Sequence, residues 1–290
     1  MGVKLSRQSS LVAGALFVLG MGAIAASAWA DAPTPISACP YTITVSASYI
    51  LTKDLTSTGT CITIAANTVT INLGGHTITG NGTGFEITDG GSLVQAIVIA
   101  NGTIQNFETG IGFVGTRNGL FSYPITITGM VVQNNQSDGI LLNGYSTVIS
   151  SQSNNNGGDG INLSNPVSIF ASEANENQGN GINGIRGGGA SFVASSKTNS
   201  NALSGIMLRQ QSQVIDSEAS GYGGDGIDLA LTPDGVAVAG STALRNGGAG
   251  ITLLCPGSAV SKHGKVQWRG QFGGDAGRDR PARAGVCQFR

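Results

Sequence analysis

Apolar and polar positions alternate in short runs that recur at a nearly fixed interval along the chain. Each run begins with a glycine and an isoleucine, and the third residue after the glycine is usually apolar too, whereas the residue between them varies. Alternation with period two predicts a β-strand with one buried face. Six such pairs are spaced by 21, 21, 24, 21 and 24 residues: Gly139-Ile140, Gly160-Ile161, Gly181-Ile182, Gly205-Ile206, Gly226-Ile227 and Gly250-Ile251.

An interval of this size is typical of a solenoid, in which each unit buries its apolar face against its neighbours. Gly84-Phe85 and Gly110-Ile111 fit the same frame at longer intervals, and a second short apolar run follows in each unit, as at Val148-Ile149 and Val214-Ile215. Apolar spacing typical of a helix is absent beyond the amino terminus. The pattern therefore predicts an all-β, single-stranded solenoid of about nine or ten coils.

Asparagines form a second column, four residues before the repeat glycine. Stacked coils would superpose these side chains about 4.8 Å apart, so each amide could donate to one neighbour and accept from the other. We expect an asparagine ladder in a tight turn, interrupted once at Tyr222. Its members are Asn106, Asn135, Asn156, Asn177, Asn201 and Asn246.

The repeats resemble those of a known family. The strings NNQSDGILL, NNNGGDGINL, GYGGDGIDL and RNGGAGITL are similar to right-handed parallel β-helix repeats of the pectate-lyase-like superfamily. The resemblance covers roughly residues 40–255 and implies a right-handed parallel β-helix. It also implies a role with polysaccharides, often polyuronides. One fold hosts many functions, so the resemblance specifies the fold far more strongly than the chemistry.

The ends of the chain differ from the repeats. Residues 1–30 contain Lys4, Arg7, an apolar run and a small-residue site before Asp31, which predicts a secretion signal peptide. An uncleaved anchor or a lipoprotein at Cys39 is the alternative. The solenoid is expected over 31–261 and a basic carboxy-terminal tail over 262–290. We therefore expect a secreted protein, extracellular or periplasmic, with no membrane span after cleavage, acting as a monomer.

Four cysteines without a C-x-x-C pair favour disulfides in an exported chain, and the simplest pairing joins Cys39 to Cys61 and Cys255 to Cys287.

Charged residues make up 11% of the chain, which also contains 46 glycines, and the charges are unevenly distributed. Residues 31–261 carry 14 acidic and 6 basic side chains, a net of −8, which disfavours nucleic acid as a partner. Residues 262–290 carry 7 basic and 2 acidic side chains, a net of +5. This tail is either an arm for an anionic partner or a poorly ordered or misread terminus.

Candidate chemistry is sparse. The superfamily's hydrolase and epimerase motifs are absent, apart from a His-Gly dipeptide at His263 in the tail. A polysaccharide lyase would need a strong base and a cation, usually calcium. Superposed coils bring Arg186 and Arg209, as candidate bases, near Asp225 and Asp228, as candidate metal ligands. The alternative is a solvated face with a few charges, because two carboxylates supply few of the six to eight oxygens that calcium takes.

A second patch could bind sugar without reaction. The longest coil inserts residues 114–124, with Arg117, Phe121 and Tyr123, and Tyr145 follows on the next coil. Aromatic rings pack well on sugar rings, although Phe121 could equally cover the core. We expect His76 to be a turn histidine without an acidic partner, and histidines and methionines are too few for a copper site.

These observations favour an exported β-helix protein that engages a polysaccharide or a cell-envelope glycan without clear catalytic machinery. The alternatives are a divergent polyuronide lyase and a structural or adhesive envelope solenoid. No cofactor is required by this interpretation, and calcium belongs to the lyase alternative alone.

Overall fold

The computed structural model describes residues 32–114, 116–117, 120–121, 124–185, 189–209, 211–221, 223–229, 235–254, 257–263, 266–269 and 285–286. Side chains are described outside 115–123 and up to residue 253. The predicted signal peptide, Cys255, Cys287 and most of the basic tail lie outside these ranges. The account below concerns the compact unit Pro33–Arg290.

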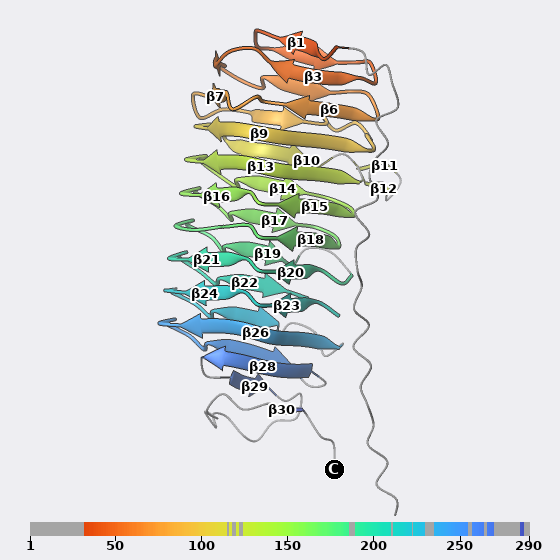
Figure 1. Ribbon diagram of the computed structural model, residues 1–290. Coiled ribbons are helices and arrows are strands. Elements are labelled where there is room, and N and C mark those ends of the chain that lie inside the picture. The colour runs from red at the N-terminus through yellow and green to blue at the C-terminus, as the bar shows by residue number, and fades with distance from the viewer. Residues whose placement is uncertain are drawn as a thin grey trace, which may run out of the picture. The chain divides into compact units, whose positions relative to one another are not determined.

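The chain winds into a solenoid of two facing parallel sheets (Figure 1). Sheet B holds one strand per coil: β2 (Tyr41–Ile43), β5 (Ile62–Ile64), β8 (Phe85–Thr88), β10 (Thr109–Phe113), β14 (Ile140–Leu142), β17 (Ile161–Leu163), β19 (Ile182–Gly184), β22 (Ile206–Leu208), β25 (Ile227–Leu229), β27 (Ile251–Leu254) and β29 (Val266–Arg269).

Sheet A faces the viewer in Figure 1 and contains two rows of strands. The first row, called A1, holds β1 (Thr34–Ile36), β3 (Ser48–Leu51), β6 (Val69–Asn72), β15 (Ser146–Ile149), β18 (Val167–Phe170), β20 (Phe192–Ala194) and β23 (Gln213–Ile215). The second row, called A2, holds β4 (Leu55–Thr56), β7 (Thr77–Thr79), β16 (Gln152–Asn154), β21 (Lys197–Asn199) and β24 (Glu218–Ser220).

Some strands are longer or lie outside these rows. The strands β9 (Ile97–Gln105), β13 (Ile125–Gln133), β26 (Val236–Leu244) and β28 (Gly257–His263) pair within sheet A, and β9, β13 and β26 run through both rows. The short strand β30 (Gly285–Val286) pairs antiparallel with β28. A hairpin of β11 (Thr116–Arg117) and β12 (Leu120–Phe121) stands apart.

The predicted parallel β-helix is confirmed. Seven coils, from Gly110 to Gly250, carry the repeat glycine in register, and sheet B counts eleven strands, so the expected nine or ten coils differ only slightly from the structure. Strands β28 and β29 continue both sheets into the segment assigned to the tail. Within the described residues, no helix is long and apolar enough to cross a membrane.

The core lies between the sheets and consists of the alternating apolar positions. In the coil of β14 and β15, Ile140, Leu142 and Val148 are fully buried, and their register partners on neighbouring coils repeat the pattern. Each such side chain contributes about 1.5–3 kcal/mol when it leaves water. A single coil could not bury these side chains, because they pack against the side chains of the coils above and below.

The asparagine ladder is present over four successive coils. The Oδ1 atom of Asn156 accepts from the backbone N–H and the Nδ2 of Asn135, and its own Nδ2 donates to Asn177 Oδ1 at 3.0 Å. Asn177 repeats this arrangement with Asn201. Every rung is nearly fully buried, so the ladder satisfies polar groups that water cannot reach.

The ladder explains why glycine recurs. A Cβ atom on Gly160 would lie 2.6 Å from the Nδ2 of Asn177, the rung of the following coil, and one on Gly226 would lie 2.4 Å from Asn246 Nδ2. Only glycine leaves room for the amide. The glycine column and the asparagine column therefore pack against each other, since each of these glycines leaves space for the asparagine amide of the following coil.

Two predicted positions in the first coils are shifted. Asn106 is exposed with φ of +62°, and Phe107 occupies the rung, since its backbone N–H donates to Asn135 Oδ1. Likewise Ile87, not Phe85, is in register with Ile111, which places Glu86 in the glycine column. The longer early coils hide this offset, because distance from a glycine does not fix register across an insertion.

The structure contains a second ladder, made of buried serines, that was not predicted from the sequence. Where A1 meets A2, a residue with left-handed φ, such as Ser150 or Ala171, turns the chain. The next residue is a buried serine whose Oγ accepts from the backbone N–H of the preceding coil at 3.2–3.3 Å. These serines are Ser151, Ser172, Ser196, Ser217 and Ser241. Their spacings of 21, 24, 21 and 24 residues match the glycine frame and could have revealed them.

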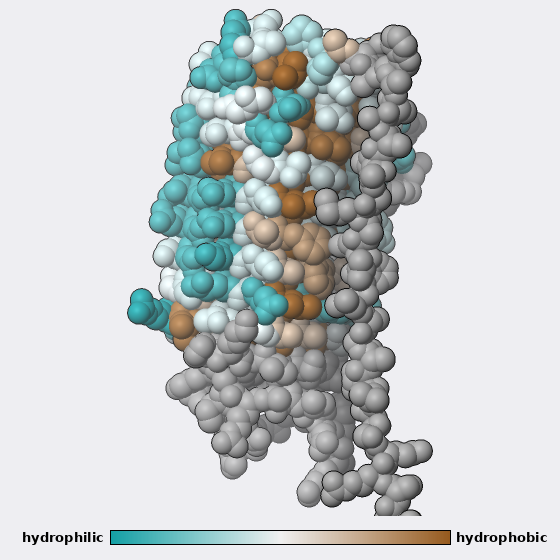
Figure 2. Space-filling model, in the orientation of Figure 1, coloured by the Kyte–Doolittle hydropathy of each residue, from teal (hydrophilic) through white to brown (hydrophobic). Residues whose placement is uncertain are grey.

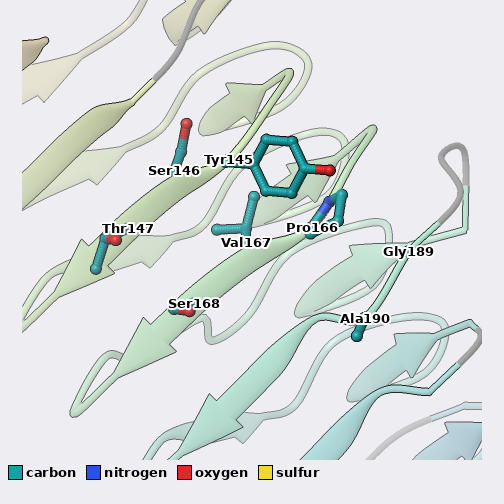
Figure 3. A pocket seen from close by; sticks show the side chains of 8 residues that line it. All are labelled: Tyr145, Ser146, Thr147, Pro166, Val167, Ser168, Gly189 and Ala190. Atoms are coloured by element: carbon teal, nitrogen blue, oxygen red, sulfur yellow. The ribbon is translucent and has the colours of Figure 1, made fainter.

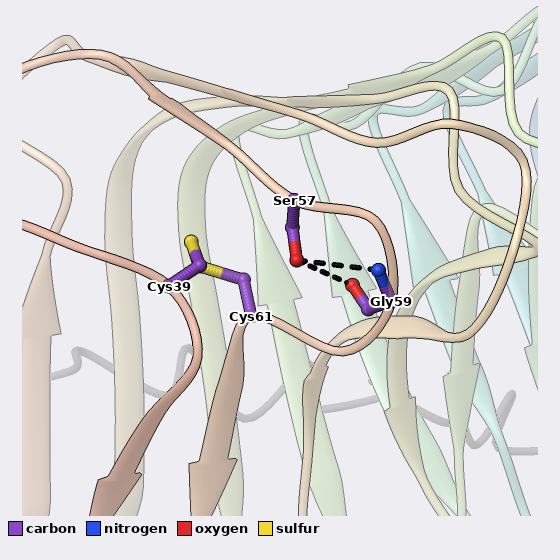
Figure 4. The surroundings of a disulfide bond; sticks show 4 residues. All are labelled: Cys39, Ser57, Gly59 and Cys61. Atoms are coloured by element: carbon purple, nitrogen blue, oxygen red, sulfur yellow. Dashed lines mark hydrogen bonds between the residues drawn. A yellow bond between two sulfur atoms is a disulfide. The ribbon is translucent and has the colours of Figure 1, made fainter.

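A disulfide joins Cys39 to Cys61 at the amino-terminal end of the solenoid (Figure 4). It lies beside a turn in which the hydroxyl of Ser57 donates a hydrogen bond to the carbonyl of Gly59. The first predicted pairing is thus present. The second, Cys255 with Cys287, lies outside the described residues.

Replacing both Cys39 and Cys61 by serine is expected to lower the free energy of unfolding by about 3 kcal/mol, because the bond closes a loop of 22 residues in the unfolded chain. Urea unfolding of the oxidised protein, the reduced protein and the double variant checks this. Reduction should mimic the substitution, and identical midpoints in all three samples would show that the bond contributes nothing.

Candidate functional site

Tyr145, from the predicted sugar patch, has 65% of its surface accessible to solvent. It directly precedes β15 and forms the wall of a pocket of about 460 Å³ on the outer face of A1 (Figure 3). The pocket spans three coils, because Ser146 pairs with Val167 and Ser168 pairs with Phe192 in the parallel register. Its lining comprises Tyr145, Ser146, Thr147, Pro166, Val167, Ser168, Gly189 and Ala190.

The chemistry of the pocket is an aromatic ring beside hydroxyl groups. Thr147 and Ser168 are half-buried and lie opposite one another on adjacent strands, so their hydroxyls line one wall. Pro166 packs on Gly189, where a Cβ would lie 2.3 Å from the proline Cγ, and this contact makes the rim apolar. Among the described lining residues there is neither a carboxylate nor a cation. Such a lining can bind a ligand by stacking and hydrogen bonding.

Of the other residues predicted for this patch, Arg117 lies in the hairpin strand β11, and its side chain is outside the described residues, as is the whole of Tyr123. Of these predicted residues, Tyr145 is therefore the one whose side chain the structure describes. The partners Thr147, Pro166 and Ser168 were not predicted, because their contribution depends on the register between strands.

The proposed lyase face is built differently from the expectation. Asp225 is engaged through both carboxylate oxygens: Oδ1 accepts from the backbone N–H of Ala249 and Oδ2 from the hydroxyl of Thr252, both at 2.7 Å. Asp138 and Asp159 make the same pair of bonds to the coils that follow them. Asp225 thus belongs to a recurring turn that ties one coil to the next.

Asp228 lies on the outer face of β25, opposite Met207 of β22, and Arg209 follows β22. Arg209 is half-buried, and its Nε atom has no hydrogen-bond partner within the described residues. Arg186 lies outside the described residues. Across the described part of the chain, no group of three or more histidine, cysteine or acidic side chains could hold a metal ion.

His76 has an acidic partner, contrary to the expectation from the sequence. Its Nδ1 lies 3.1 Å from Asp54 Oδ1, which also accepts from the backbone N–H of Thr77 at 2.9 Å. The bond from Thr77 and then the one from His76 hold the pKa of Asp54 below its ordinary value. Asp54 is 22 residues earlier, one coil away, so this contact ties two turns together.

Glu86 is an acidic residue in the described core. It is fully buried, and both carboxylate oxygens lack a hydrogen-bond partner within the described residues. Burial raises its pKa well above the ordinary value. The register places it between Cys61 and Gly110, in the column where other coils have glycine beside an asparagine rung. The rung of the following coil is Phe107 rather than an asparagine, so the column offers no rung amide to this carboxyl group.

A second pocket, of about 360 Å³, lies beside the disulfide. Hydroxyl groups of Thr56, Ser57, Thr58 and Thr79 line it, and no aromatic ring is among its described lining residues. It lacks the stacking surface that distinguishes the Tyr145 pocket.

Comparison with known proteins supports the fold. The family model described as right handed beta helix region matches residues 109–265, more than half of the chain. No curated protein and no solved structure matches the chain. The match begins at β10 and covers the coils that carry the asparagine and serine ladders. The chain therefore belongs to the family of the right handed beta helix region.

Proposed function

We propose that this protein binds polysaccharide on the outer face of sheet A, at the pocket of Tyr145, without catalysing a reaction there. The observation that carries this proposal is an aromatic ring held 65% exposed above a row of hydroxyls on a rigid sheet. The ring would stack on the apolar face of a sugar, and Thr147 and Ser168 would exchange hydrogen bonds with its hydroxyls. The volume of about 460 Å³ is within the usual range for small-ligand sites.

The state of Asp225 supports binding rather than lyase chemistry. A calcium ion takes six to eight oxygens, and both oxygens of Asp225 already accept hydrogen bonds from the next coil. Recruiting this carboxylate for a metal would cost the contact between two turns.

Export would fit this function, since extracellular and envelope glycans lie outside the cytoplasm. The Cys39–Cys61 disulfide supports an oxidising compartment, where such bonds persist. Mass determination of the exported chain tests this proposal, and an amino terminus at Asp31 is the expected result.

Replacing Tyr145 by alanine is expected to weaken glycan binding about tenfold or more, because the stacking surface is lost. The measurement is retention on columns of immobilised polysaccharides, with affinities by calorimetry for any glycan that retains the protein. The matched variant Tyr145→Phe keeps the ring and should keep most of the affinity. Since the side chain is exposed, both variants should unfold at the wild-type temperature.

Two results would contradict the proposal. Equal retention of the wild type and the alanine variant would move the binding site elsewhere. A wild type that no glycan retains would leave a purely structural solenoid.

A further inference from the structure

The face beside the Tyr145 pocket is apolar where a half-exposed strand should be polar. On the A1 strands the inward residues, such as Val148 and Ile169, are fully buried, and the outward ones alternate with them. One outward column nevertheless reads Ile149, Phe170, Ala194, Ile215 and Ala239 on five successive coils in register. Solvated faces of sheets normally carry polar residues at these positions.

This apolar column is visible in Figure 2, where brown atoms gather over β15 to β23 beside a teal column over the A2 strands. Phe170 is 36% exposed, and its ring lies 5.5 Å from that of Phe192 on the next coil. The column of Thr147, Ser168 and Phe192 connects it to the Tyr145 pocket, because these three residues are in register. Pocket, hydroxyls and aromatic pair therefore form one continuous surface.

Charge decides which glycan suits this surface. The described outward positions of β15, β18, β20 and β23 carry no charged side chain. Charges occur instead on or beside the A2 strands, at Glu173, Lys197 and Glu218. The body over residues 31–261 has a net charge of −8, from 14 acidic and 6 basic side chains. An anionic polyuronide would meet the repulsive field of the acidic body and no cation among these described strand positions.

We infer that the A1 face binds an uncharged polysaccharide whose chain runs along the solenoid axis. This inference rests on the proposed function and adds the class and the direction of the glycan. Apolar sugar faces would lie on the column of Ile149 and Phe170 beyond Tyr145. Coils stack about 4.8 Å apart, close to the length of one sugar unit in an extended chain, so successive sugars would meet equivalent positions.

The test uses the full chain and two hexasaccharides of equal length, the neutral cellohexaose and an oligogalacturonate, with calorimetry at low and high salt. The expected result is binding of the neutral glycan with an affinity that salt does not change. Phe170→Ser should weaken it about tenfold. Leu244→Ser, which removes a 44% exposed apolar side chain from the A2 part of β26, should leave it unchanged.

Each contrary outcome overturns a different statement. Stronger binding of the oligogalacturonate, weakened by salt, would overturn the inference while the proposed function survives. Binding of cellohexaose that Tyr145→Ala weakens and Phe170→Ser does not would overturn the axial path alone. If no glycan binds and sedimentation shows a dimer that Phe170→Ser dissociates, a second copy covers this face, and both proposals fall.

Discussion

Replacing Glu86 by methionine is expected to stabilise the protein at neutral pH by about 1–3 kcal/mol, the cost of a buried polar group without a hydrogen-bond partner. Both oxygens of Glu86 lack such a partner within the described residues, and the side chain is fully buried. Methionine has a similar length and fills the same space without a polar atom. Urea unfolding at neutral pH measures the difference.

The pH dependence gives a sharper test of the same residue. Burial raises the pKa of Glu86 in the folded protein above its ordinary value of 4.5. Above that value the unfolded chain releases the proton, while the folded protein retains it up to its own higher pKa. The free energy of unfolding of the wild type should therefore fall as pH rises through this interval, by about 1.4 kcal/mol per pH unit.

This slope should disappear in Glu86→Met and in Glu86→Gln, since neither side chain ionises. The glutamine variant should gain less stability at neutral pH, because its amide remains without a partner. Glu108→Met replaces an exposed glutamate of the same region and serves as the control, with a stability close to that of the wild type. A wild-type slope that survives in both Glu86 variants would assign the pH dependence to another group.

Replacing Asn156 by alanine is expected to destabilise the protein by about 3–5 kcal/mol. Asn156 accepts two hydrogen bonds from Asn135 and donates one from its side chain to Asn177. Its loss leaves two buried donors of Asn135 without this acceptor, whereas Asn177 Oδ1 keeps the bond from the backbone N–H of residue 156. Each such group costs about 1–3 kcal/mol, and a core rung cannot be rescued by water. Thermal and urea unfolding check the loss.

The matched control is Asn246→Ala, at the far end of the column. The Nδ2 of Asn246 makes one long bond, 3.4 Å, to the carbonyl of Ala219, and its Oδ1 has no partner within the described residues. Removing it should cost about 1 kcal/mol. Equal losses at the two positions would show that the ladder is not cooperative and that the interior rung has no special role.

Much of the candidate site could not be predicted, for a reason that particular residues show. Tyr145 was recognised because it is an aromatic residue on the coil next to the long insertion at residues 114–124, and both features can be read from the sequence. Its pocket partners Thr147 and Ser168 are 21 residues apart, and only the register of β15 and β18 makes them neighbours. The same holds for Asp225, whose two oxygens find their donors on the next coil.

The sequence by itself determined the parallel β-helix, its interval and the rungs from Asn135 to Asn201. The reason is that equivalent contacts in successive coils require the same residue types at a nearly constant spacing. Tertiary structure decided whatever depends on alignment between unequal coils. It put Phe107 in place of Asn106 and Glu86 in a column of glycines, and it placed Asp54 beside His76. The physical reason is that backbone hydrogen bonds between stacked strands fix the register, and each insertion shifts it by an amount that the intervals alone do not reveal.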